Sequence, residues 1–268
     1  MKYAFDDYEP DLYFLKHNLK ELSDWKKKNS LPFENPFCMS YTKRNKKIDY
    51  IGLTKDCKKN KKLMSKFIQK STDLVLVTDL YFEEGINSSY EDVSVDTKSA
   101  LEFCKKYYVP YAGLEGDDLM FIKKMLFKDY TEEDLLLYIF LCLYVYFSRD
   151  MKENVDEFRN KLPGYMHDYQ ELLERPNFSY KKEFYDVFQK DFNYGVTSYD
   201  LIKPEKDSKY FMKTLAYEEF KFKNSFMAKA IFEYINQFNN VVIIAPQEYA
   251  YSQSKVFGEE FGKNNFFI

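Results

Sequence analysis

Short, almost continuously apolar runs alternate with amphipathic helical patterns along much of this 268-residue chain. The clearest runs are residues 73–79 and 240–245, and two less apolar strand-like runs are residues 46–55 and 109–113. A run without polar alternation is typical of a strand that is covered on both faces, as in a parallel sheet. Strands that alternate with helices are characteristic of α/β layers. We therefore predict an α/β fold with a largely parallel or mixed central sheet that is flanked by helices.

The middle third of the chain differs from the rest. Between residues 119 and 215 no strand-like run occurs, and helical patterns dominate. We expect a discontinuous α/β core over residues 1–118 and 216–268, with residues 119–215 as a helical insertion or lid packed on that core. Helical spacing of apolar residues predicts further helices in the core, over residues 8–28, 58–70, 96–108, 224–238 and 251–261.

Composition and charge narrow the class of protein. The chain has 40 Lys and Arg against 43 Asp and Glu, and it has no basic motif interleaved with aromatics, so nucleic acid is not an expected partner. Residues 135–147, the longest apolar stretch, are fewer than the about 20 that span a bilayer, so no transmembrane segment is expected. The chain begins without a signal segment and its four cysteines lack metal-binding spacing, which favours a cytoplasmic protein with reduced thiols. Secretion by a signal-independent route and self-association both stay open.

The position of the predicted strands locates a candidate site. Ligands of open α/β sheets bind beyond the carboxyl ends of the strands, where loops and helix N-termini meet. The segments that follow the four predicted strands are residues 52–56, 78–85, 113–118 and 245–249. This geometric reasoning gives a place for a site but no reaction.

Five blocks of the chain resemble motifs of one superfamily. The first is Ile48-Asp-Tyr-Ile-Gly-Leu-Thr-Lys55, and residues 73–87 and 109–115 follow it in order. Residues 222–231 resemble the Arg-Asp helix of that superfamily, and residues 240–249 resemble its final strand and second histidine motif. The superfamily contains the erythromycin esterases, the ChaN-like haem-binding proteins and the TraB/Tiki proteins. The resemblance implies an α/β fold with a site at these motifs.

Several motif positions depart from the superfamily's pattern. Its catalytic members carry Gly-x-x-His after the first strand, Glu after the second and third strands, and a second Gly-x-x-His after the last. In this chain Lys55 and Glu248 stand at the two histidine positions. Thr78 replaces the first glutamate, whereas Glu115 retains the second. The resemblance therefore makes Glu115 the most important candidate residue.

The Arg-Asp helix departs as well, because Lys223 and Asn224 replace its two charged residues. The two histidines of the chain, His17 and His167, lie outside all five blocks. Neutral imidazole binds metal ions and exchanges protons near neutral pH, whereas protonated lysine repels a cation. We therefore expect a catalytically degenerate protein without a cofactor, whose strand-end cleft binds a small anionic ligand or a partner protein.

Further residues complete the predicted site. Facing motifs imply an ion pair between Lys55 and Glu248, although both side chains could instead point into solvent. Asp117 and Asp118 suit the first turn of a helix, and together with Glu115 they also form a carboxylate set that a divalent cation would accept. The residues expected to bind ligand are Thr78, Asp79, Asp117, Asp118, Asn224 and Tyr249. Lysines around the first motif form either a solvated face or a positive rim that attracts an anion.

Two other functions stay open. In a working hydrolase, Glu115 would act as a general base or carboxylate ligand, and Lys55 or Lys223 would stabilise developing negative charge. In a haem-binding protein, Tyr81 or Tyr249 would be the axial ligand. A divalent metal or haem is thus the alternative to a cofactor-free protein.

Overall fold

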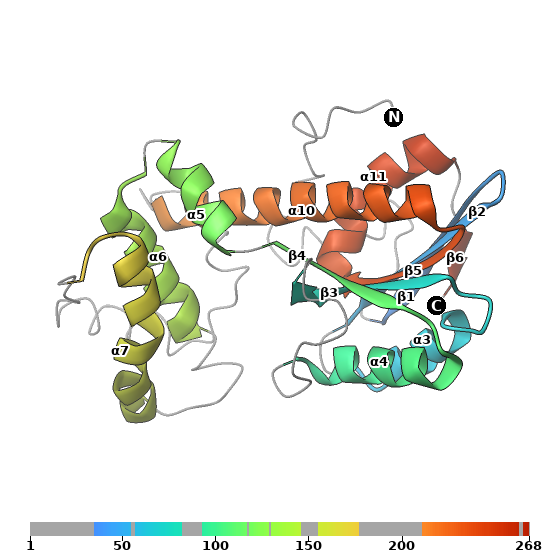
Figure 1. Ribbon diagram of the computed structural model, residues 1–268, viewed down its shortest axis with the longest axis horizontal. Coiled ribbons are helices and arrows are strands. Elements are labelled where there is room, and N and C mark those ends of the chain that lie inside the picture. The colour runs from blue at the N-terminus through green and yellow to red at the C-terminus, as the bar shows by residue number, and fades with distance from the viewer. Residues whose placement is uncertain are drawn as a thin grey trace. The chain divides into compact units, whose positions relative to one another are not determined.

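The strand-forming runs of the sequence lie next to one another in one sheet of the computed structural model (Figure 1). The structure describes residues 35–54, 57–81, 93–116, 118–128, 130–145, 155–176, 211–262 and 265–267. The chain divides into two compact units, Met1–Asp117 with Phe220–Ile268, and Asp118–Glu219. The helix predicted over residues 8–28, and His17 within it, lie outside the described residues.

The first unit is built on a six-stranded sheet of order β4-β3-β5-β2-β1-β6. Its strands are β1 (Phe37–Lys43), β2 (Lys46–Leu53), β3 (Leu74–Tyr81), β4 (Tyr111–Glu115), β5 (Asn240–Pro246) and β6 (Asn265–Phe267). β5 pairs in parallel with β2 and β3, and β3 pairs in parallel with β4. β1 is antiparallel to both β2 and β6. The predicted α/β fold with a largely parallel, mixed sheet is confirmed.

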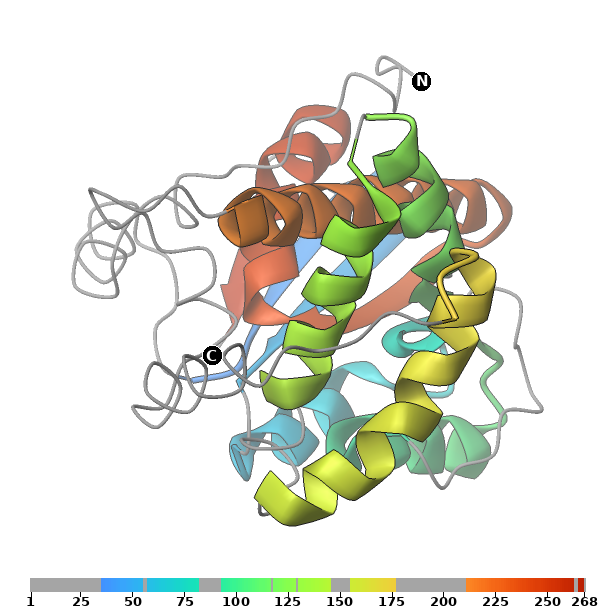
Figure 2. The same cartoon turned by 90° about the vertical axis from the view of Figure 1, so that its left-hand side faces the viewer.

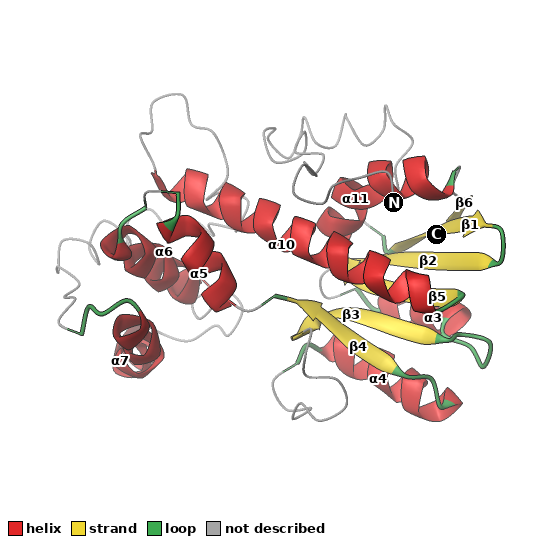
Figure 3. Cartoon of the chain, turned by 45° about the horizontal axis from the view of Figure 1, so that its top comes forward, coloured by secondary structure: helices red, strands yellow, loops and turns green. Residues whose placement is uncertain are grey.

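Helices cover both faces of this sheet, as Figures 1 and 3 show. One face carries α3 (Lys59–Phe67) and α4 (Val95–Tyr107). The other face carries α11 (Gln247–Phe261) and the later part of α10 (Phe211–Gln237). The continuously apolar strands follow from this arrangement, because both faces of the central strands exclude water.

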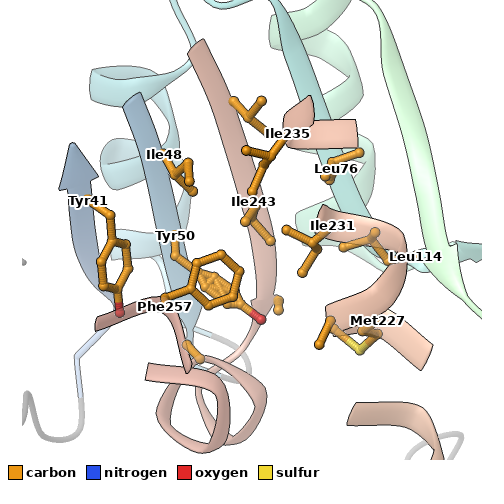
Figure 4. Packing of buried hydrophobic residues seen from close by; sticks show 14 of the residues in the cluster. Tyr41, Ile48, Tyr50, Leu76, Leu114, Met227, Ile231, Ile235, Ile243 and Phe257 are labelled. Carbon is orange, nitrogen blue, oxygen red and sulfur yellow. The ribbon is translucent and has the colours of Figure 1, made fainter. Parts of the chain in front are cut away.

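Alternate residues of the strands face opposite layers. Leu76 of β3 and Ile243 of β5 pack with Ile231 of α10, and Figure 4 shows these three side chains together. Their neighbours Val77 and Ile244 belong to the cluster on the α3 and α4 side. This period of two is the geometry of a pleated strand.

The second unit is helical in the part of the chain that the structure describes. It contains α5 (Asp118–Leu126), α6 (Glu132–Val145), α7 (Val155–Leu172) and the first turns of α10, which Figure 2 shows in green to orange. Within this unit, the buried Tyr138 donates a hydrogen bond to Glu219. No helix among the described residues combines the length and the apolar character that crossing a bilayer requires.

Candidate functional site

A pocket of about 210 Å³ lies in the first unit, at the carboxyl ends of β3, β4 and β5. The residues that line it are Thr78, Glu115, Gly116, Lys223, Met227, Pro246 and Tyr249. They come from three of the four strand-end segments selected in the sequence and from the helix that resembles the Arg-Asp motif. The pocket therefore joins Thr78, Glu115, Lys223 and Tyr249, four residues that the sequence analysis named.

Glu115 and Lys223 form an ion pair within this pocket. Glu115 is the last residue of β4, and its Oε1 lies 3.5 Å from Nζ of Lys223 on α10. The side chains are 35% and 23% exposed, respectively. A charge-assisted hydrogen bond would measure about 2.7–2.9 Å, so the two charges attract each other without closing into a short contact.

The approach of β4 to α10 depends on Gly116, which directly follows Glu115. A Cβ atom built on Gly116 would lie 3.1 Å from the ring of Phe226, closer than ordinary van der Waals contact. A glycine allows the chain to pass this ring without displacing it. The end of β4 can thus lie close to α10, which brings Glu115 near Lys223.

The remaining walls of the pocket are mostly apolar. Met227 is 3% exposed and belongs to the core on this face of the sheet. Tyr249 lies in the first turn of α11, and its ring stacks on Phe220 with centroids 5.2 Å apart. Thr78 of β3 is buried and supplies a hydroxyl. The pocket thus combines one pair of opposite charges with apolar walls.

Asn224 lies in a buried polar network, and the structure does not place it among the residues that line the pocket. Its side chain is fully buried, and its Oδ1 accepts hydrogen bonds from Ser252 and, at 3.3 Å, from Gln253. Its Nδ2 donates to the carbonyl oxygen of Phe220 at 3.1 Å. The hydroxyl of Tyr50 donates to Oε1 of Gln253 at 2.9 Å, which extends the network from α10 and α11 to β2.

Glu248 lies half-buried in the first turn of α11. Burial raises the pKa of the Tyr251 phenol, and the negative charge of Glu248 adds a smaller increase. Lys55, the predicted partner of Glu248, lies outside the described residues, as does Asp117. The side chains of Asp79, Tyr81 and Asp118 are not described either, so the predicted ion pair and carboxylate set stay predictions.

Two residues that the sequence analysis did not select hold the loop after β2. Nε2 of Gln247 donates to the carbonyl oxygen of Asn35 at 2.7 Å and to Oγ1 of Thr54 at 2.6 Å. Nδ2 of the fully buried Asn60 donates to the carbonyl oxygen of Thr54 at 2.8 Å and to Asp96 at 2.7 Å. Gln247 lies in the predicted strand-end segment 245–249, which is the one signal that could have identified it. Nothing in the local sequence marks Asn60.

The lysines near the first motif, between residues 43 and 66, have two kinds of surroundings: some pair with glutamates and others line a pocket. Lys43 and Lys61 pair with Glu260 and Glu102, each at 3.0 Å. Other lysines line a second pocket, of about 250 Å³, on the α3 side of the first unit. The residues lining it are Asn35, Pro36, Lys59, Lys62, Leu63 and Lys66. This second pocket contains none of the strand-end residues.

Within the described ranges, no three His, Cys, Asp or Glu side chains gather as a metal site would require. Comparisons with models of protein families, with curated proteins and with solved structures find no match to this chain. A functional assignment therefore rests on the geometry of the strand-end pocket and on the motif blocks of the sequence.

Proposed function

We propose that the strand-end pocket binds a small ligand that carries an anionic group, in a divergent and catalytically inactive member of the superfamily described above. The observation that carries this proposal is the joining of Thr78, Glu115, Lys223 and Tyr249 around one pocket. These residues come from separate parts of the chain, and each was selected from the sequence for its place after a strand or in a motif. Convergence of polar groups in one concave site is the usual mark of ligand binding.

Lys223 supplies the positive charge for an anionic group, and the hydroxyl of Thr78 supplies a hydrogen-bond donor. The apolar walls formed by Met227 and Pro246 would contact the uncharged part of the ligand. Pockets for drug-sized molecules measure about 300–1,000 Å³. A volume of about 210 Å³ therefore suits a metabolite-sized molecule better than a protein surface or a porphyrin.

Catalytic inactivity is supported by the residues at the motif positions. Glu248 and Lys55 stand at the motif positions where catalytic members carry two imidazoles, the side chain that exchanges protons near neutral pH. Among the described residues that line the pocket there is no histidine, cysteine or serine. Glu115 remains as a carboxylate beside a cation, and its role in our proposal is to bind and orient the ligand.

Calorimetric titration tests ligand binding. The full chain is titrated with phosphate, with small carboxylates such as pyruvate and citrate, and with free amino acids. We expect at least one of these to bind and Lys223→Gln to weaken it by about tenfold or more, because the cation is lost. Lys229→Gln, which removes an exposed lysine from the same helix, is the matched control and should bind as the wild type does. No binding by any compound, or equal binding by both variants, contradicts the proposal.

A panel of ester and phosphoester substrates tests inactivity separately. We expect no turnover above the uncatalysed rate. Turnover that Glu115→Gln abolishes would identify the protein as a hydrolase that uses this carboxylate, and would overturn the inactive assignment.

A further inference from the structure

The strand-end pocket presents two opposite charges side by side. Of its described lining residues, Glu115 carries a negative charge and Lys223 a positive one. Resting on the function proposed above, we infer that the ligand carries an amine next to its carboxylate. The class of ligand that this describes is the free α-amino acid, bound with its ammonium group at Glu115 and its carboxylate at Lys223.

The charge arrangement disfavours a ligand with a single charge. A carboxylate at Lys223 would lie only a few ångströms from the carboxylate of Glu115, because the pair itself is 3.5 Å apart. Like charges within about 4–6 Å disfavour each other. A lone amine at Glu115 would meet the same repulsion from Lys223. A zwitterion offsets each repulsion with an additional attraction, because its ammonium group faces Glu115 while its carboxylate faces Lys223.

The dimensions of an α-amino acid agree with the spacing of the pair. Its ammonium nitrogen and carboxylate carbon are joined through bonds of about 1.46 Å and 1.52 Å. Its two charges are therefore a few ångströms apart, comparable with the 3.5 Å between Glu115 and Lys223.

The other walls of the pocket indicate the kind of side chain. Met227, Pro246 and the ring of Tyr249 form apolar surface beside the charged pair. Apolar surface favours an apolar group of the ligand because both are removed from water. A volume of about 210 Å³ limits that group to a modest size. Leucine and methionine are amino acids of this description.

Three probes that share the isobutyl side chain of leucine separate the effects of the two charges. Leucine carries both charges, 4-methylpentanoate lacks the amine, and 3-methylbutylamine lacks the carboxylate. By calorimetry at pH 7, we expect leucine to bind about tenfold or more tightly than either analogue. The other free amino acids are ranked beside leucine in a thermal-shift assay to find the preferred side chain.

Two variants should each remove the preference for leucine over one of the two analogues. Glu115→Gln should weaken leucine about tenfold while 4-methylpentanoate binds as well as before or better, because its repulsion is gone. Lys223→Gln should weaken leucine and spare 3-methylbutylamine. Retained binding of one analogue shows that each variant is folded. Glu233→Gln and Lys229→Gln, exposed positions on α10, should bind all three probes as the wild type does.

The outcomes distinguish this inference from the proposed function. If leucine and 4-methylpentanoate bind equally, or if simple anions bind and no amino acid does, the amino-acid assignment is wrong and the anion site stands. If Glu115→Gln weakens both compounds to the same extent, the carboxylate does not recognise the amine. If no amino acid and no anion binds, both proposals fail together.

Discussion

The amide oxygen of Asn224 accepts a hydrogen bond from the hydroxyl of Ser252, which ties α10 to α11. The same hydroxyl lies 3.0 Å from the carbonyl oxygen of Tyr249, and Asn224 directly follows Lys223 in the chain. Two pocket residues, one on each helix, are thus next to or bonded to one buried network. The network fixes the backbone positions from which Lys223 and Tyr249 reach the pocket.

Replacing Asn224 with alanine should destabilise the protein. The change removes an acceptor that Ser252 and Gln253 use in a fully buried place, and a buried polar group left without its partner costs about 1–3 kcal/mol. Urea unfolding measures the loss. Asn236→Ala, an exposed position on the same helix, should stay within about 0.5 kcal/mol of the wild type. Equal stability of the two variants would show that the network contributes nothing.

Gly52 of β2 should not tolerate a side chain. A Cβ atom there would lie 2.6 Å from the ring of Phe37, which is fully buried and stacks on Tyr251. Gly52→Ala should therefore lower the free energy of unfolding by about 1–3 kcal/mol, as overpacking does.

Gly258 of α11 gives the matched control for that variant. A Cβ atom at Gly258 meets nothing within 4 Å, and alanine favours a helix interior over glycine by about 1 kcal/mol. Gly258→Ala should leave stability unchanged or increase it. Gly52→Ala protein that unfolds at the same urea concentration as Gly258→Ala would show that the ring of Phe37 moves aside freely.

The central strands could be predicted from the sequence because each of them is a run of consecutive apolar residues. β3 and β5 are apolar on both faces, so a local pattern is enough to find them. β1 was missed, because Ser40 interrupts its apolar residues. Ser40 is buried nevertheless, since it lies opposite Asp49 of β2 and donates a hydrogen bond to that carboxylate. This pairing between strands is not visible in either segment alone.

In the site, too, some residues can be predicted from local sequence, whereas others depend on contacts between distant parts of the chain. Thr78, Glu115 and Tyr249 lie in the strand-end segments that the rule for open sheets selected, and the motif resemblance then singled out Thr78 and Glu115 within them. Lys223 was selected only through the motif resemblance, because no local pattern places a mid-helix lysine beside the end of β4. The contacts of Gln247 with Asn35 and Thr54 depend on the folded chain, and the sequence analysis had no means to predict them.

Alkaline pH should destabilise the protein partly through Cys104. This thiol on α4 is 1% exposed, and burial raises its pKa to about 12. In an unfolded chain the pKa is about 8.5. A thiol whose pKa is raised on folding contributes to the free energy of unfolding. This contribution is complete below about pH 8.5 and is lost as the pH rises toward 12. Each such group lowers the free energy of unfolding by about 1.4 kcal/mol per pH unit in that interval.

Urea unfolding at several pH values between about 8.5 and 11 measures this slope. In Cys104→Ala protein the slope should be shallower than in the wild type by the contribution of one group. Cys57→Ala, which removes a less buried thiol, is the control for the loss of a thiol as such. An unchanged slope in Cys104→Ala protein would mean that Cys104 ionises in the folded state as it does in the unfolded chain.

The ion pair between Glu115 and Lys223 should matter more for binding than for stability. Both side chains are partly exposed and their charges are 3.5 Å apart, and exposed pairs of this kind contribute about 0.2–1 kcal/mol. Glu115→Gln, Lys223→Gln and the double variant should therefore unfold within about 1 kcal/mol of the wild type in urea, with a coupling energy inside the same limit. A loss of several kcal/mol in either single variant would identify the pair as structural. Stability retained alongside lost binding would instead support a role of these two charges in holding the ligand, because their removal would then affect binding without affecting folding.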